Sequence, residues 1–362
     1  MNLLDTANAY LEHNFDGLDF LVRDKNTFHA RDASVVFKAK FPKDELDLRI
    51  KHKLTTNIVE GKCMRALFYD FQRMIITNPM EASSIRTMNL GNACEEQEKS
   101  YYKAMGIYHS AHIRLFNTEY QISGELDCLV WEYDDILAPD GKLTGRVIIR
   151  EPRRLIGVEI KSFYGSYAEK EIIDNGIPKW NHVLQSLVYL DYYKPNIPYW
   201  LLKYITRGGG VKQGRQFKLQ ISKLSDEIFI DGALVKEFAM KDVYSRFKKA
   251  QFLIDGNILP DRDFVYNYPK ELVELRYKKG DISGKKYKDY TNGYQYISDW
   301  QCNYCPYLLE CWKDVHGNNV RGAKAYEEEA KSGASTPTAT VVDSSVSGDT
   351  ARSGKGKGGA DA

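Results

Sequence analysis

The chain has 362 residues, of which 43% are hydrophobic and 28% are charged, and its formal net charge is +2 at pH 7. This length and apolar content suffice for one large domain or two modest ones with a sizeable core. The near-neutral charge balance argues against a uniformly basic surface that coats nucleic acid, so any DNA contact must come from local patches.

Three local basic patches are candidates for such a contact. They are Arg153 with Arg154, the run 207–215, and the segment 276–288, in which tyrosines are interleaved with lysines. Each is equally well explained as a solvated loop, because charge runs usually are.

Neither a membrane span nor a signal peptide is indicated. No uninterrupted apolar run approaches the ~20 residues needed to cross a bilayer. The N-terminus MNLLDTANAYLEHNF has acids where a signal peptide needs lysine or arginine followed by an apolar stretch. We therefore expect a cytoplasmic protein that does not bind membranes.

The sequence pattern of the N-terminal half predicts helices followed by strands. Residues 1–54 form an N-terminal segment of unknown function, with a short amphipathic helix over Leu3 to Leu11 and a strand within 33–41. Residues 61–105 predict helix, with Ser83 or Ser84 as N-cap and Gly106 as the stop. Five strands are predicted next, within 107–116, 119–124, 125–133, 145–151 and 154–163. A turn-rich stretch at 134–145 separates the third strand from the fourth.

The second half continues the alternation of helices and strands. Pro178 opens a helix whose apolar residues recur on one face, and strands follow within 198–206 and 215–222, then a long helix over 225–255. This order predicts an α/β core with a mixed sheet flanked by helices. The tail 326–362 is rich in Ser, Gly, Thr, Ala and Lys, so we expect it to be disordered.

The segment 157–162, GVEIKS, places an acid and a lysine two residues apart inside a predicted buried strand. Side chains of a strand alternate between faces, so Glu159 and Lys161 point the same way, roughly 6 to 7 Å apart along the chain. Such a pair is a natural site for metal and phosphate. The triplet alone is a weak signal, since Glu-x-Lys occurs by chance roughly once in a chain of this length, and its neighbours must decide.

Asp127 lies upstream, in the strand-like segment SGELDCLVW. If the two strands are neighbours, Asp127 and Glu159 converge, because directly opposed side chains come within about 5 Å at Cβ. Two such carboxylates repel unless a cation lies between them, and hard oxygen ligands favour magnesium or manganese. This arrangement suits phosphodiester hydrolysis, in which Lys161 would orient the water or neutralise charge on the scissile phosphate.

Two helical features can surround this centre. Glu95 is a candidate further ligand, with Glu96 as the alternative if the register differs and a solvated acidic face as the ordinary interpretation. Gln185 and Tyr189 are spaced i, i+4 and share a helix face. They are candidates for holding a nucleic-acid strand at its phosphate or sugar, although such a pair is more often plain helix surface.

Three of the six cysteines form C-x2-C-x5-C, at Cys302, Cys305 and Cys311. In a cytosolic chain, clustered cysteines are metal ligands more often than disulfides. Cys63 is the candidate fourth ligand, although a lone cysteine is more often a small buried residue, and this is the interpretation we give Cys94 and Cys128. An iron-sulfur cluster and a zinc ion both remain open from the spacing.

Taken together and in this order, these residues resemble the RecB-like branch of the PD-(D/E)XK nuclease superfamily. The chain is most similar to its iron-sulfur members, the CRISPR-associated exonucleases with a cysteine clasp and the nuclease domains of AddB-type recombination subunits. The resemblance covers roughly residues 55–320 and rests on Cys63, Glu95, Asp127, Glu159-x-Lys161, Gln185-x3-Tyr189 and Cys302-x2-Cys305-x5-Cys311. The chain departs from the pattern in having Glu95 where the superfamily often has histidine, and in lacking a proline before Asp127.

The resemblance implies a restriction-endonuclease-like core in a domain spanning 55–325. Asp127 and Glu159 would be Mg2+ or Mn2+ ligands, Glu95 an additional ligand and Lys161 the catalytic lysine. Gln185 and Tyr189 would position DNA. The four cysteines Cys63, Cys302, Cys305 and Cys311 would hold a structural [4Fe-4S] cluster that clasps the two ends of the domain, which removes the entropy of a long loop.

The first functional hypothesis is therefore a metal-dependent DNA nuclease, a phosphodiester hydrolase. We expect an exonuclease on single strands or free ends in recombination, repair or CRISPR-like processing. The alternatives are a noncatalytic DNA-binding or scaffold protein that keeps the fold, and a zinc-stabilised RNA-processing protein. GDISGKK, residues 280–286, fails as a P-loop, so a helicase or recombination protein would be a separate partner.

Overall fold

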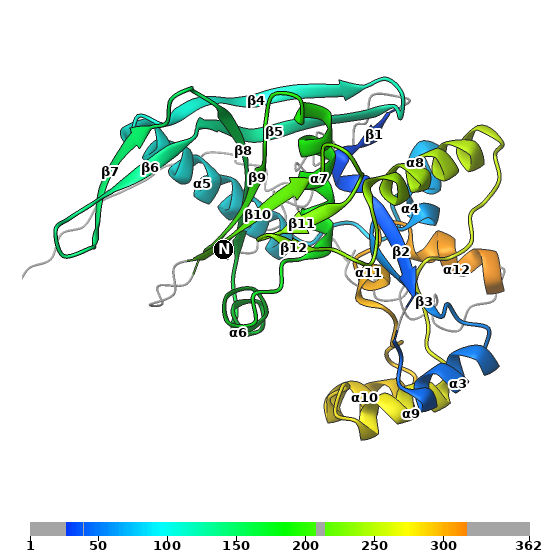
Figure 1. Ribbon diagram of the computed structural model, residues 1–362. Helices are drawn as coiled ribbons and strands as arrows, with labels where there is room; N and C mark the ends of the chain where they lie inside the picture. The colour runs from blue at the N-terminus through cyan, green and yellow to red at the C-terminus, as the bar shows by residue number, and fades with distance from the viewer. Residues whose placement is uncertain (1–26, 39, 208–213, 317–362) are drawn as a thin grey trace, which may run out of the picture. The chain divides into compact units, whose positions relative to one another are not determined.

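The structure is a computed structural model that describes residues 27–38, 40–207 and 214–316 (Figure 1). The predicted helix over Leu3 to Leu11 and the predicted tail 326–362 lie outside the described residues. Within them the fold is mixed α/β, with a mixed sheet flanked by helices, as the sequence predicts. Among these residues, no helix is both long enough and apolar enough to span a membrane.

The main sheet has eight strands, in the order β1-β5-β8-β9-β10-β11-β12, with β4 also paired to β5. The pairs β1–β5 and β8–β9 are parallel and the other pairs are antiparallel. The strands are β1 Phe28–His29, β4 Tyr108–Asn117, β5 Ile122–Trp131, β8 Leu155–Phe163, β9 Trp200–Thr206, β10 Gly214–Ile221, β11 Ile228–Ile230 and β12 Ala233–Leu234. The two predicted strands within 119–133 are thus mostly one strand, β5.

Strand β5 changes partner part-way along one edge. Its first residues, Ile122 and Ser123, pair with β1, and its last four, from Cys128 to Trp131, pair with β8. Because β4 pairs with both halves of β5, β1 and β8 must lie on the opposite edge. Residues 124–127 therefore have no ladder partner on this edge, and the backbone polar groups that point to this edge can bond elsewhere.

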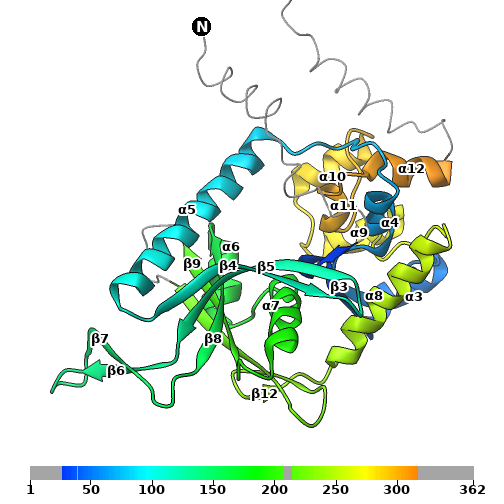
Figure 2. The same ribbon diagram turned by 90° about the horizontal axis from the view of Figure 1, so that it is seen from above.

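Two helices cover opposite faces of this sheet (Figure 2). Helix α7, Trp180–Tyr193, buries Val183, Leu184, Leu187 and Val188, which is the apolar face predicted from its sequence spacing. Helix α5, Ala82–Ala104, packs Tyr102 against Val158 and Ile160 of β8. Since Val158 and Ile160 face α5, strand alternation turns Glu159 and Lys161 toward α7.

The long insertion between Asp127 and Glu159 is a hairpin. Strands β6, Tyr133–Leu137, and β7, Leu143–Ile149, pair antiparallel in a sheet of their own. Figure 1 shows this ribbon projecting from the ends of β5 and β8. It returns the chain to the edge that it left, so the insertion does not separate β5 from β8. The turn predicted at 134–145 is confined to the hairpin tip.

Two helix predictions need correction. The predicted helical region 61–105 is two helices, α4 (Met64–Phe71) and α5, and the N-cap of α5 is Glu81 instead of Ser83 or Ser84. Gly106 does stop α5, with φ of 75° directly after the C-cap Met105. The predicted helix over 225–255 begins only at Met240 as α8, Met240–Asp255, because residues 228–234 add strands β11 and β12 to the sheet edge.

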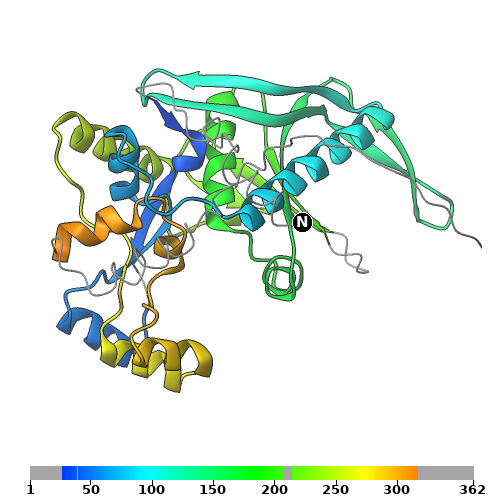
Figure 3. The ribbon, with the colours of Figure 1, turned by 180° about the vertical axis from the view of Figure 1, so that it is seen from behind.

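Segments from both ends of the described chain pack together beside the main sheet (Figure 3). One apolar cluster joins α3 to α9 and α10, and another joins α4 to the cysteine-bearing segment. Strand β2 pairs with β3 and also contacts α8. The elements concerned are η1 Ala30–Asp32, β2 Ser34–Lys38, α3 Lys43–Lys51, β3 Asn57–Gly61, α9 Lys270–Lys278, α10 Gly284–Thr291, α11 Trp300–Asn303 and α12 Leu308–His316.

Candidate functional site

Asp127 and Glu159 lie opposite each other where β5 changes partner. The β5–β8 ladder ends with Cys128 opposite Val158, so the next pair in the same register is Asp127 with Glu159. A carboxylate oxygen of Asp127 accepts the backbone N–H of Ile160 at 2.7 Å and thereby continues the strand pairing through its side chain. The predicted convergence of these two carboxylates is confirmed as geometry.

Lys161 links the two acids. Its ammonium hydrogen-bonds to Glu159 and lies 3.9 Å from Asp127 Oδ2. Glu159 has no exposed surface, and its second oxygen, Oε2, has no hydrogen-bond partner among the described residues. A buried carboxylate oxygen without a hydrogen-bond donor is unfavourable, so Oε2 of Glu159 can accept a hydrogen bond from a further donor or bind a cation.

Burial and mutual charge shift the acid–base properties of this pair. Burial, with the negative charge of Asp127, raises the pKa of Glu159 to about 8. Burial opposes the charged form of Lys161, but the charges of Glu159 and Asp127 outweigh it and raise the pKa of Lys161. Lys161 is therefore cationic at neutral pH, and the site favours positive charge.

Glu95, and not Glu96, is electrostatically coupled to the two strand acids. Burial and the charge of Asp127 raise the pKa of Glu95, with Lys99 and Lys161 opposing them. Glu96 is exposed, and Lys99 lowers its pKa. The alternative ligand Glu96 therefore shows no such coupling to the centre.

Lys99 is a site residue that the sequence interpretation missed. Its buried ammonium lies 2.5 Å from Glu95 Oε1 and 2.9 Å from Glu96 Oε1. The i, i+4 spacing of Glu95 and Lys99 on a helix was the available signal. His112 of β4 lies between Lys99 and Glu125, with Nδ1 2.7 Å from Glu125 Oε1 and Nε2 3.3 Å from the Lys99 ammonium.

Tyr189 of α7 hydrogen-bonds to strand β5. Its ring is fully buried, and its hydroxyl donates to the carbonyl of Glu125 at 3.1 Å, within the stretch 124–127 that has no ladder partner on the edge away from β4. Gln185 donates to the same hydroxyl at 3.2 Å. A phenol without exposed surface cannot contact a nucleic-acid strand in this conformation, so the expectation that Tyr189 touches DNA directly is corrected to a role in positioning β5. Gln185 is only partly buried.

His182, one turn before Gln185, is a second residue that the sequence interpretation missed. Its Nδ1 lies 3.1 Å from the hydroxyl of Tyr204, which also accepts the backbone N–H of Lys179 at 3.0 Å. Burial, together with the charges of Lys161 and Lys179, holds the pKa of His182 well below its usual range. A neutral histidine thus lies among cations, and its i, i+3 spacing from Gln185 was the available signal.

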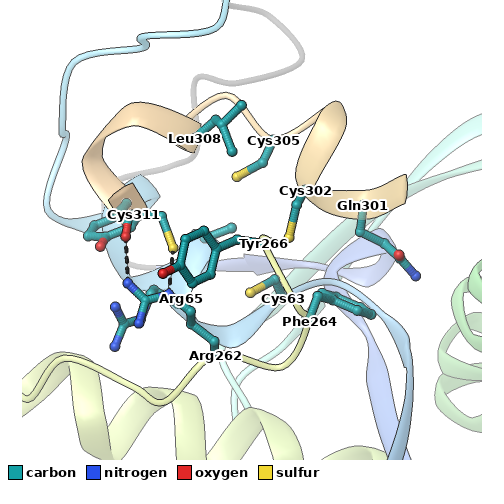
Figure 4. Close-up of a pocket in the computed structure, with 12 residues that line it drawn as sticks. Cys63, Arg65, Arg262, Phe264, Tyr266, Gln301, Cys302, Cys305, Leu308 and Cys311 are labelled. Atoms are coloured by element: carbon teal, nitrogen blue, oxygen red, sulfur yellow. Dashed lines mark hydrogen bonds between the residues drawn. The ribbon is translucent and has the colours of Figure 1, made fainter. Parts of the chain in front are cut away.

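The four predicted cysteine ligands line one cavity. Cys63 precedes α4, Cys302 lies in α11, Cys305 follows it, and Cys311 lies in α12. Their sulfur atoms face the same space in Figure 4, and none forms a disulfide. Other lining residues include Arg262, whose Nε donates to Cys311 Sγ at 3.1 Å.

Burial governs the thiols of this cavity. Burial, then the charge of Asp263, raises the pKa of Cys63 to about 12, and burial also raises the pKa of Cys302 and of Cys305. Cys128, outside the cavity, is a buried core residue as expected, and Cys94 is half-buried in α5. Within the described ranges, no group of three or more His, Cys, Asp or Glu side chains is arranged so that it could hold a metal ion.

No protein-family model matches this sequence, and no curated protein matches it.

Proposed function

We propose that the protein is a metal-dependent DNA nuclease that acts on single strands or free ends. The observation that supports this most is the meeting of Asp127 and Glu159 across two strands, with Lys161 bonded to Glu159 and close to Asp127. Two acids and a lysine on adjoining strands can hold a divalent cation and a phosphate together.

Asp127, Glu159 and Glu95 are the residues that would hold Mg2+ or Mn2+, and their side chains would have to close around the ion, because as they lie in the described structure they do not form a ready metal site. The buried, unpartnered Oε2 of Glu159 fits such a ligand, as does the raised pKa of both glutamates, because a cation would stabilise their charged forms. When bound, the metal would lower the pKa of an attacking water and polarise the scissile phosphate.

The other residues would bind and orient the strand. Cationic Lys161 neutralises charge that grows on the phosphate, and neutral His182 offers a ring nitrogen beside it. Gln185 is oriented by its bond to Tyr189, which leaves its amide oxygen and second N–H for the strand. Tyr189 of α7 would fix β5, and with it Asp127, through its hydrogen bond to the carbonyl of Glu125.

We further propose that Cys63, Cys302, Cys305 and Cys311 hold a [4Fe-4S] cluster, with Zn2+ as the alternative. The support is the chemistry of the donors: four cysteines outside any disulfide, from segments far apart in the chain, line one cavity. Arg262 beside Cys311 would stabilise a thiolate there. A cluster would tie α4 to α11 and α12 and would stabilise the fold.

The function is tested with end-labelled single-stranded and duplex oligonucleotides and circular DNA, each with Mg2+ or Mn2+. Glu159→Ala and Lys161→Ala should each lower the cleavage rate at least about 100-fold. The matched control is Glu60→Gln on β3, since burial also raises the pKa of Glu60, and this variant should cleave like the wild type.

Three results would count against the proposal. Cleavage unchanged by both site variants would refute the site. A wild type that binds DNA but cleaves none of the substrates would favour the noncatalytic scaffold. Cleavage of circular DNA as fast as linear DNA would refute the need for ends.

A further inference from the structure

The connection between β8 and α7 exposes aromatic rings directly after the candidate catalytic strand. Tyr164 follows the last residue of β8 and is 75% exposed, and Tyr167, in the short helix α6 (Ser166–Glu169), is 79% exposed. Tyr164 is only three residues from Lys161. Exposed tyrosine rings offer flat apolar surfaces on which a ligand can stack.

The exposure of these rings is not explained by a loose segment. After α6 the chain forms one π-helical turn, Lys170–Asp174, in which Ile172 is fully buried. Arg215 of β10 donates to the carbonyl of Ile173 at 2.9 Å, and its guanidinium packs so close to Gly176 that a Cβ there would lie 2.6 Å from it. The connection is anchored to the sheet at this point, so the tyrosines are held on a fixed base.

An arginine is the strand neighbour of Tyr164. Strands β8 and β9 run parallel with Phe163 opposite Thr206, so Arg207 is the neighbour of Tyr164 in the same register, and its N–H donates to the carbonyl of Phe163. The Arg207 guanidinium donates to the carbonyl of Thr87 on α5 at 3.0 Å, while its buried Nε has no hydrogen-bond partner among the described residues. No carboxylate of the described residues forms an ion pair with it.

Exposed rings and an arginine at the carboxyl ends of two adjoining parallel strands match what single-stranded nucleic acid requires. Unpaired bases stack on aromatic side chains, and the phosphates between them need positive charge. Bases of a duplex are already stacked on one another and are not free to do this. Ligands of open α/β sheets bind outside the carboxyl ends of the strands, which is where Tyr164 and Arg207 lie.

We propose that Tyr164 and Tyr167 form a base-stacking platform for single-stranded DNA, with Arg207 contacting the adjoining phosphate. The platform would bind unpaired nucleotides at the end of the strand that carries Lys161 and so select single strands over duplex. This inference rests on the proposed nuclease function, because it takes the strand that binds here to be the substrate.

The test is binding of a fluorescent 20-nucleotide DNA to the full chain, measured by anisotropy without added Mg2+ or Mn2+ at one fixed salt concentration. Tyr164→Ala and Tyr167→Ala should each weaken binding about 10-fold. Tyr164→Trp and Tyr167→Phe keep an aromatic ring and should bind within about 2-fold of the wild type. Phe252→Ala removes a ring that is 68% exposed on α8, away from the platform, and should bind like the wild type.

An abasic oligonucleotide of equal length separates stacking from charge. It keeps the phosphates and lacks the bases, so the two tyrosine substitutions should not change its affinity. Arg207→Gln should weaken the binding of both the abasic and the normal oligonucleotide. A 20-base-pair duplex should bind more weakly than the single strand in the wild type, and the tyrosine substitutions should leave that binding unchanged.

The failures of the two proposals are distinguishable. If the wild type cleaves DNA but the tyrosine variants bind single strands as tightly as the wild type, the platform is refuted and the nuclease stands. If the wild type cleaves nothing but binds single strands through the two rings, the platform stands and the nuclease is refuted. Equal losses on abasic and normal DNA would also refute stacking.

Discussion

The carboxylate of Asp127 accepts the backbone N–H of Ile160 at 2.7 Å, and so a side chain takes the place of a backbone acceptor between β5 and β8. This bond forms where β5 has left β1 and has not yet joined the β8 ladder. One oxygen of Asp127 is committed to the sheet, and the charge of the group acts on Glu159 and Lys161. Structure and electrostatics thus depend on the same residue.

The two roles of Asp127 are separable by substitution. Asp127→Asn keeps an oxygen acceptor for Ile160, so its free energy of unfolding should lie within about 0.5 kcal/mol of the wild-type value. Asp127→Ala should lower the free energy of unfolding by about 2 kcal/mol. Both should lose cleavage, because both lack the charge. The free energy of unfolding from urea titrations, measured beside the cleavage rate, checks this, and equal stability of the two variants would show that the bond to Ile160 contributes nothing.

Gly124 is required for the close approach of Tyr189 to β5. A Cβ at this position would lie 2.7 Å from Cε1 of the Tyr189 ring, and a fully buried ring has little room to move. Gly124→Ala should therefore lower the free energy of unfolding by about 1 to 3 kcal/mol, measured in guanidinium titrations.

Gly91 provides the control for this prediction, with the opposite sign. A Cβ there meets only Ser162 Oγ, at an ordinary 3.5 Å, inside helix α5. Gly91→Ala should raise stability by about 0.5 to 1 kcal/mol, because alanine loses less backbone entropy than glycine in a helix. If both variants were destabilised alike, the clash with Tyr189 would not be the cause.

Glu45 should make the free energy of unfolding fall as the pH becomes acidic. It is buried on α3 between Arg49 and Arg276, each at 2.9 Å. Burial opposes its charge, but the hydrogen bonds and charges of Arg276 and Arg49 outweigh burial and lower its pKa below the ordinary 4.5. Because the folded-state pKa is the lower one, the stabilisation is complete above about pH 5 and is lost as pH falls through the folded-state value.

The corresponding variant is Glu45→Gln, which leaves the buried guanidinium of Arg49 and the half-buried guanidinium of Arg276 with less compensation. At pH 7 it should be less stable than the wild type by about 3 kcal/mol, and the difference should shrink steadily below about pH 4.5. Urea titrations between pH 3 and pH 7 measure it. A difference that stays constant down to pH 3 would contradict the assigned role of the ion pairs.

The cysteine cavity should carry metal in anaerobically purified protein. Iron with acid-labile sulfide and a brown colour are expected for the wild type and for Cys94→Ser, whose cysteine lies outside the cavity. Cys63→Ser and Cys302→Ser should lose the iron and lower the melting temperature, since the cross-link between distant segments is lost. Elemental analysis and visible absorbance measure this, and stoichiometric zinc without iron would replace the cluster by a zinc site.

Short-range pattern determined part of this protein by itself. Strand alternation alone placed Glu159 and Lys161 on one face and Val158 and Ile160 on the other, and helical spacing alone gave the buried face of α7. Gly106 marked the end of α5 because a positive φ costs glycine little. These features depend on neighbours within a few residues, which a single sequence contains.

The tertiary structure decided what meets across long separations. It alone shows that the β6–β7 hairpin returns the chain so that Asp127 faces Glu159, that Glu95 rather than Glu96 is electrostatically coupled to them, and that Tyr189 is buried under β5. It also brings Cys63 to a cavity shared with Cys302, Cys305 and Cys311. Strand pairing and helix docking are set by the packing of the whole core, so local periodicity carries no record of which partner a residue will find.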